Sequence, residues 1–134
     1  MPKSTAASSD TLSANLQGTD PSWRANVNRY VAFHTADPGV GGTQSTNETA
    51  YTGYTRQPIP IGGWSGTGAS RSNTSLIQFP QCGVTGSVIT HVSIGTLVSG
   101  AGQILYSGPL SSPLTVANLI QPQFSPGALV ATES

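Results

Sequence analysis

The chain has 134 residues, which is enough for one domain with a single hydrophobic core. Charged residues make up only 7% of it and the formal net charge is zero, whereas an ordinary soluble domain carries roughly 25% charged residues. Five Lys and Arg residues cannot follow a phosphate backbone and no apolar run approaches the length of a membrane span, so we expect neither a nucleic-acid partner nor a membrane contact.

Residues 1–25 differ in composition from the rest of the chain. Their low hydrophobicity is typical of an extended N-terminal arm. Ser9 or Asp10 is expected to cap a short helix that ends at Gly18 and carries two leucines one turn apart. Such a helix is not stable alone in water, so it needs a surface to lie on. The predicted partner-binding residues of the arm are Leu12, Leu16, Trp23 and Arg24.

From residue 26 onward, short stretches rich in β-branched and aromatic residues alternate with Gly and Pro. The first stretch ends in a turn formed by Asp37, Pro38 and Gly39, where Pro presets φ and Gly accepts a positive φ. The second contains two prolines that cannot donate ladder hydrogen bonds, which places it at a sheet edge. The predicted strands cover residues 28–35, 54–61, 74–79, 87–94, 103–106, 114–117, 119–124 and 128–132.

Two details of this assignment depend on local pattern. In residues 87–94, strict alternation places Val88, Thr90, Val92 and Ile94 on one face and Ile89 with His91 on the other. Residues 62–73 are rich in Gly and Ser and are predicted to form a loop around Trp64.

Seven or eight short strands separated by turns indicate an all-β fold. We predict a single β-sandwich, jelly-roll-like in its strand count, that covers residues 26–134 and carries the arm of residues 1–25. Ten prolines and sixteen glycines leave little room for long helices. No repeat of fixed period is visible, so a fibrous β-solenoid is not expected.

Groups that carry chemistry are few. His34 at a strand end is expected to hydrogen-bond a loop, His91 to pack within the sheet, and Cys82, the one cysteine, to be a small buried thiol. No paired carboxylate, nucleophile elbow or metal-ligand spacing occurs. We therefore predict no catalytic residue, no cofactor and no metal, and expect that the chain is not an enzyme.

Three weaker possibilities remain open. The loop from Asp37 to Glu48 offers two carboxylates, too few for a typical calcium site. An ion pair between Glu48 and Arg56, if exposed, contributes about 0–1 kcal/mol. Trp64 and the tyrosines have the side chains that stack on sugars, although core or interface packing is their commoner role.

A resemblance to a known family rests on motifs between residues 30 and 130. The order of these motifs resembles that of a family of small tailed-phage virion proteins, in which a strand ends in a His-Thr-Ala-Asp-Pro-Gly turn and is followed by an acidic loop and a Gly-Tyr-x-Arg strand. The arm is more polar than the apolar helix usual in that family. The motifs are residues 30–39, 47–48, 51–56, 76–80, 91–95, 102–108 and 126–129.

The resemblance implies a structural virion protein that assembles in the host cytoplasm. Such proteins are labelled tail-fibre proteins, and others are similar to head decoration (cement) proteins with a jelly-roll core. We predict a decoration protein on the capsid exterior that binds the major capsid protein as a homodimer or homotrimer. The alternative is a small tail or tail-fibre component with glycan-binding loops, and a polysaccharide hydrolase ranks third.

Overall fold

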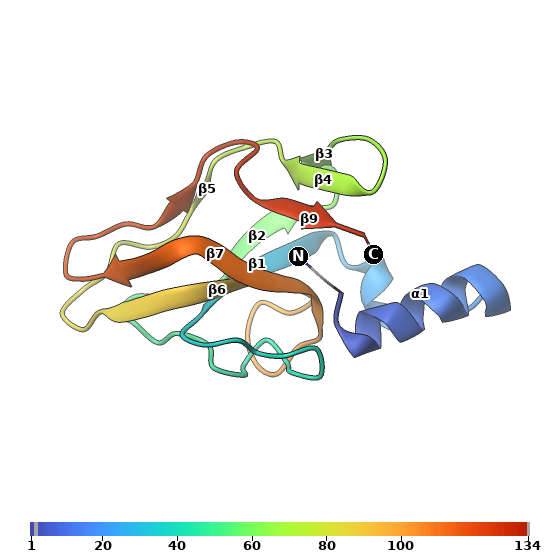
Figure 1. Cartoon of the computed structure of the whole chain (residues 1–134), viewed down its shortest axis with the longest axis horizontal. Helices are drawn as coiled ribbons and strands as arrows, with labels where there is room; N and C mark the ends of the chain where they lie inside the picture. Colours follow the sequence, from blue (N-terminus) through green and yellow to red (C-terminus); the bar gives the residue numbers. More distant parts are fainter. Residues whose placement is uncertain (2, 134) are drawn as a thin grey trace.

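The fold is a β-sandwich with one N-terminal helix (Figure 1). It was obtained as a computed structural model, which describes residue 1 and residues 3–133. The main sheet has the strand order β2-β1-β6-β7. A three-stranded sheet, β3-β4-β9, and a two-stranded sheet, β5-β8, complete the fold. The all-β class and the N-terminal helix predicted from the sequence are confirmed.

All pairings between these strands are antiparallel. The elements are α1 (Thr5–Gln17), a 3-10 helix η1 (Ser22–Ala25), β1 (Asn28–His34), β2 (Gln57–Pro60), β3 (Trp64–Ser65), β4 (Ser70–Asn73), β5 (Ile77–Gln78), β6 (Ser87–Gly95), β7 (Ile104–Val116), β8 (Gln123–Phe124) and β9 (Val130–Thr132).

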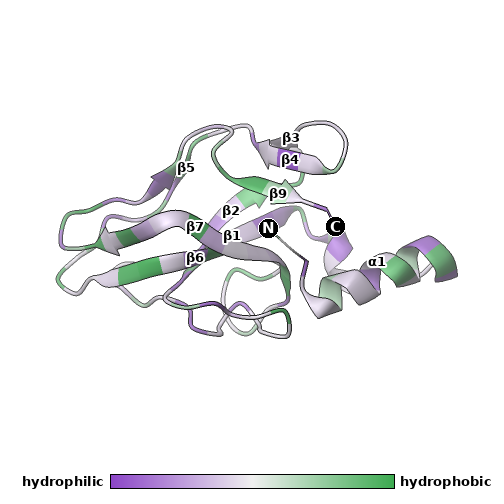
Figure 2. Ribbon diagram, viewed as in Figure 1, coloured by the Kyte–Doolittle hydropathy of each residue, from purple (hydrophilic) through white to green (hydrophobic). Residues whose placement is uncertain are grey.

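The hydrophobic core lies on one face of the main sheet. Phe33 of β1 stacks on Phe79 with ring centroids 4.1 Å apart, and both side chains are fully buried. Burial of a side chain of this size contributes about 1.5–3 kcal/mol. Cys82 is a free, buried thiol in this core, as predicted. Hydrophobic residues are prominent along β6 and in the outer half of α1 (Figure 2).

The main sheet is covered on both faces at the C-terminal end of β1. Val31 and Phe33 point into the core, whereas His34 bonds the loop that follows β1 on the opposite face, and Ala32 is also buried. The last four residues of β1 are therefore all buried, without the alternation of a sheet that has one solvated face. β2 lies at the edge of the sheet, as its prolines predicted.

The alternation predicted for residues 87–94 is wrong, and it breaks where the register between β6 and β7 shifts. Residues 110–113 of β7 bulge out opposite Thr90, between the pairs Ile89–Leu114 and His91–Pro109. A bulge bends the strand pair and increases its local twist, which changes the direction of nearby side chains. Ile89 therefore joins the core with Val92.

Strand boundaries also differ from the prediction, and of the predicted strand 119–124 only β8 is a strand. Residues 62–73 form the hairpin of β3 and β4 rather than a loop, with Trp64 paired to Asn73. The stretches 103–106 and 114–117 belong to one strand, β7, because the chain continues through the bulge.

Helix α1 begins earlier than predicted. Ser4, not Ser9 or Asp10, is its N-cap, and its Oγ accepts a hydrogen bond from the backbone N–H of Ala7 at 3.0 Å. The helix ends, as predicted, at Gly18, whose φ is 67°. Among the residues described, no helix is long and apolar enough to cross a membrane.

Candidate interaction surfaces

The base of α1 is fixed to the edge of the main sheet. Lys3 forms an antiparallel bridge with Tyr106 of β7, and the Ser4 N–H donates to the Leu105 carbonyl at 3.1 Å. The Lys3 ammonium also pairs with the Glu133 carboxylate. The segment before α1 therefore pairs with part of the edge strand β7, and the helix starts from a rigid point.

One face of α1 continues this contact. Ala7 is buried. One carboxylate oxygen of Asp10, Oδ2, accepts hydrogen bonds from Trp23 Nε1 and from Gln103 Nε2, both at 2.8 Å. These contacts join the helix to both η1 and the start of β7. Beyond them the helix projects away from the sandwich (Figure 1).

The two leucines of α1 lie on the other face. Leu12 is 59% exposed and Leu16 is 78% exposed. Residues advance by about 100° each around an α-helix, so these two side chains point away from the docked face that Ala7 and Thr11 share. The two leucines that were predicted to bind a partner therefore remain exposed in this domain.

The other two predicted partner residues behave differently from the leucines. Trp23 is half-buried against its own domain, where its indole bonds Asp10 and Arg29 lies over its ring with Cζ 4.9 Å from the centroid. Arg24 is exposed and lies 3.7 Å from the Asp20 carboxylate. The structure does not bring Trp23 and the leucines onto one surface.

The predicted turn after β1 is a structural feature. Asp37 Oδ1 accepts a hydrogen bond from the Gly39 N–H at 2.8 Å, and Gly39 has a φ of 75°. Pro38 is buried, and the Gly42 N–H donates to the Gly39 carbonyl. The turn begins the loop that covers the second face of the sheet.

Beneath that loop lies a buried polar network. His34 Nδ1 is 2.8 Å from the Thr46 carbonyl and Nε2 is 2.8 Å from Ser93 Oγ. Because a carbonyl can only accept, Nδ1 carries the proton. Burial lowers the pKa of His34, which keeps the ring neutral, and the ring has no access to solvent. His34 is thus a loop-bonding histidine, as predicted.

Glu48 and Arg56 form the second part of this network. Arg56 donates to both carboxylate oxygens of Glu48, and Tyr54 donates its hydroxyl to Oε2 at 2.7 Å. Burial, with the bond to Glu48, raises the pKa of Tyr54. The calcium alternative for this loop has no support, since Arg56 occupies both Glu48 oxygens. No group of three His, Cys, Asp or Glu that suits a metal ion occurs in the described part of the chain.

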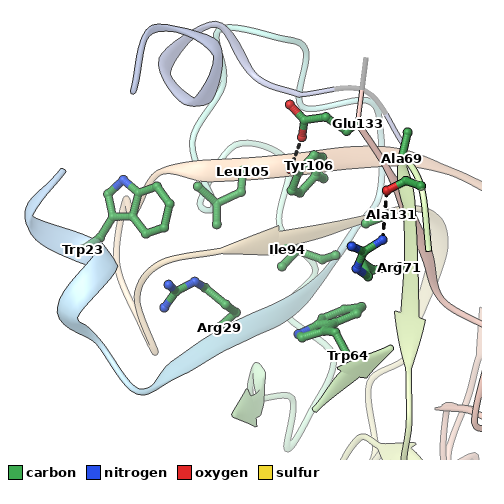
Figure 3. Close-up of a pocket in the computed structure, with 11 residues that line it drawn as sticks. Trp23, Arg29, Trp64, Ala69, Arg71, Ile94, Leu105, Tyr106, Ala131 and Glu133 are labelled. Atoms are coloured by element: carbon green, nitrogen blue, oxygen red, sulfur yellow. Dashed lines mark hydrogen bonds between the residues drawn. The ribbon is translucent and has the colours of Figure 1, made fainter. Parts of the chain in front are cut away.

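A cavity of about 440 Å³ opens between η1, the main sheet and the β3-β4 hairpin. Both tryptophans of the chain line it. Figure 3 shows Leu105, Ile94 and Arg29 between Trp23 and Trp64, with Arg71 beside Trp64. The sequence singled out Trp64 and Trp23 separately. The shared cavity was not predicted, because Trp23 lies in η1 and Trp64 lies in β3, and only the folded structure brings these two elements to one cavity.

The opposite end of the molecule carries no charge. Residues 72–132 contain no Asp, Glu, Lys or Arg. The turns at 81–87 and 117–121 are joined there by hydrogen bonds between Cys82 and both Leu119 and Ile120, at the end of the sandwich far from α1 (Figure 1). Val84 is 87% and Leu119 69% exposed. We call these two turns the uncharged end.

Comparison with known proteins identifies the family. No curated protein matches the chain. The sequence profile of the family described as podophage GP4 fiber I protein gp80 matches residues 2–132, which is nearly the whole chain. This agrees with the resemblance to small tailed-phage virion proteins carried by the strand, turn and loop motifs. The chain therefore belongs to the podophage GP4 fiber I protein gp80 family and is a structural protein of the phage virion.

Proposed function

We propose that the chain is a non-catalytic subunit of a fibre on the phage virion, and that α1 fastens it to another virion protein. The observation that carries the proposal is the pair Leu12 and Leu16, exposed on the free face of a helix whose base is fixed to the sheet. The description of the family as a fibre protein supports the fibre.

The leucines supply the attachment energy. Burial of each side chain against a partner contributes about 1.5–3 kcal/mol before the cost of ordering is subtracted. The base of the helix is already ordered by Ser4, Lys3 and Ala7, so docking does not have to order that part of the arm.

A non-catalytic role is consistent with the residues around the cavity. Most glycoside hydrolases use two carboxylates across the scissile bond. Glu133 is the only carboxylate among the described residues that line the cavity, and it is bonded to Lys3 and Tyr106. We therefore do not favour the hydrolase alternative.

The attachment is tested with the double variant Leu12→Ser/Leu16→Ser, introduced into the phage. We expect virions that contain much less of this chain than parental virions, measured by quantitative mass spectrometry against the major capsid protein. Val84→Ser/Leu119→Ser is the matched control, because it removes two similarly exposed apolar side chains from the uncharged end. Parental amounts of the leucine variant in the virion would contradict the proposal.

Decoration of the capsid shell is the second candidate, with the major capsid protein as partner and two or three copies per site. It is favoured by the compact sandwich and by a helix of 13 residues, which is marginal for a trimeric coiled coil. Copy number separates the candidates. A decoration protein approaches the abundance of the major capsid protein, whereas a fibre subunit matches a small multiple of the tail symmetry. Electron microscopy of tagged virions gives the location.

A further inference from the structure

We propose that the cavity between Trp23 and Trp64 is a binding site for a carboxylated saccharide. This inference does not depend on where the chain sits in the virion. The volume of the cavity, about 440 Å³, falls in the range of small-ligand sites, about 300–1,000 Å³. The chemistry of its walls indicates the ligand class.

The two indoles line the cavity from η1 and from the β3-β4 hairpin, and Arg29 covers one face of the Trp23 ring (Figure 3). Trp23 is held by its bond to Asp10 and by Arg29 over its ring. The backbone of Trp64 pairs with that of Asn73 in the β3-β4 hairpin, and its side chain packs against the hydrophobic core. Both are half-buried rather than part of a sealed core. Aromatic faces that are ordered before binding suit the C–H faces of pyranose rings, since little side-chain freedom is lost.

The two arginines give the site its preference for an anion. Among the residues described, neither Arg29 nor Arg71 pairs with a carboxylate. Arg29 donates through Nη1 to the Asn26 and Asn28 carbonyls, and Arg71 donates through Nη1 to backbone carbonyls of its own hairpin. The remaining guanidinium donors of both residues have no partner there. A planar guanidinium fork matches a carboxylate.

The one acidic side chain at the cavity does not cancel this charge. Glu133 is bonded to the Lys3 ammonium and to the Tyr106 hydroxyl, the latter at 2.6 Å. Its charge is balanced by Lys3, and two positive charges remain at a mostly apolar cavity. An acidic sugar satisfies both features at once, because its ring stacks on an indole and its carboxylate pairs with a guanidinium.

The fluorescence of the protein reports on this site directly, because its only two tryptophans line the cavity. The purified chain is titrated with tetragalacturonic acid and with α2,8-linked tetrasialic acid. Galactotetraose is the neutral control and tetraglutamate is the control for charge alone. We expect a saturable change in tryptophan emission with at least one acidic oligosaccharide and none with either control.

Substitutions of the arginines then test whether these side chains bind the acidic oligosaccharide. Arg71→Gln, at an exposed position, and Arg29→Gln are each expected to weaken binding by about tenfold or more, since each removes a charge-assisted hydrogen bond. Arg24→Gln removes an exposed arginine that does not line the cavity and is expected to bind as the parent does. Circular dichroism melts establish that each variant is folded.

Three results would overturn the proposal: no saturable change with either acidic oligosaccharide, equal affinity for galactotetraose or tetraglutamate, or parental affinity in a folded Arg71→Gln variant. Isothermal titration calorimetry on the same samples provides a readout independent of the tryptophans. Loss of virion attachment in the leucine variant has no bearing on this result, so the two proposals fail separately.

Discussion

Arg56 and Glu48 form a two-pronged ion pair in the interior of the protein. Nε donates to Oε2 at 2.7 Å and Nη2 donates to Oε1 at 2.8 Å, and the side chains are only 3% and 17% exposed. Arg56 also donates to the carbonyls of Leu97 and Gly100. One guanidinium therefore joins the loop after β1 to the loop between β6 and β7.

Arg56→Ala is expected to lower the free energy of unfolding by about 3–5 kcal/mol, because it leaves the largely buried Glu48 carboxylate without its cationic partner. Urea unfolding followed by circular dichroism measures the change. The control is Arg24→Ala, which breaks the exposed pair with Asp20 and should change stability by about 0–1 kcal/mol. Equal effects of the two substitutions would show that Arg56 is solvated in solution.

Gly95→Ala is expected to destabilise the protein by about 1–3 kcal/mol through overpacking. A Cβ at Gly95 would collide with the buried side chain of Gln44, which bonds both the N–H and the carbonyl of Leu97. Gly41→Ala is the matched control, since a Cβ there meets nothing within 4 Å. A thermal melt of each variant tests this. Equal melting temperatures would mean that Gln44 does not occupy this place.

Gly39→Val is expected to cost about 1–2 kcal/mol, because its φ of 75° lies in the left-handed region that β-branched residues avoid. Space is not the cause, since no atom lies within 4 Å of a Cβ at this position. Gly39→Asn should cost less, because Asn tolerates this region better than Val. If Val and Asn give the same melting temperature, backbone strain is not what selects glycine here.

His34 should make stability depend on pH in the mildly acidic range. Burial lowers its pKa below the usual value, so the unfolded chain binds a proton where the folded protein does not. The free energy of unfolding therefore falls as pH decreases below about 6.5, by at most about 1.4 kcal/mol per pH unit. Urea titrations between about pH 7.5 and about pH 5.5 measure it. His34→Gln should reduce the dependence of the free energy of unfolding on pH. An unchanged dependence would mean that another group causes it.

The sequence predicted the parts of the fold that follow from local chemistry. The prolines in β2, the positive φ of Gly39 and the helix end at Gly18 each follow from the conformations that one residue type allows. Ser4 was missed as the N-cap because Ser and Thr occur throughout the arm, so local chemistry does not select one cap among them.

Features that depend on contacts distant in sequence were not predicted. The face to which Ile89 points depends on residues 110–113 of β7, and the burial of Arg56 depends on carbonyls 41 and 44 residues away. The leucines of α1 were predicted to bind a partner, and the structure leaves both of them exposed. Trp23 was expected to lie with them but joins Trp64 instead, because η1 turns its ring toward the sheet.

The uneven distribution of charge gives the two ends of the molecule different responses to salt. At about 1 M ionic strength the Debye length falls to about 3 Å, and attraction between an exposed guanidinium and an anion is largely screened. The turns at 81–87 and 117–121 contain no such group. Any contact made through Val84 and Leu119 would persist in concentrated salt and would be strengthened by sulfate. High ionic strength would therefore weaken the proposed binding of an anion at the cavity but would not weaken an apolar contact at the uncharged end.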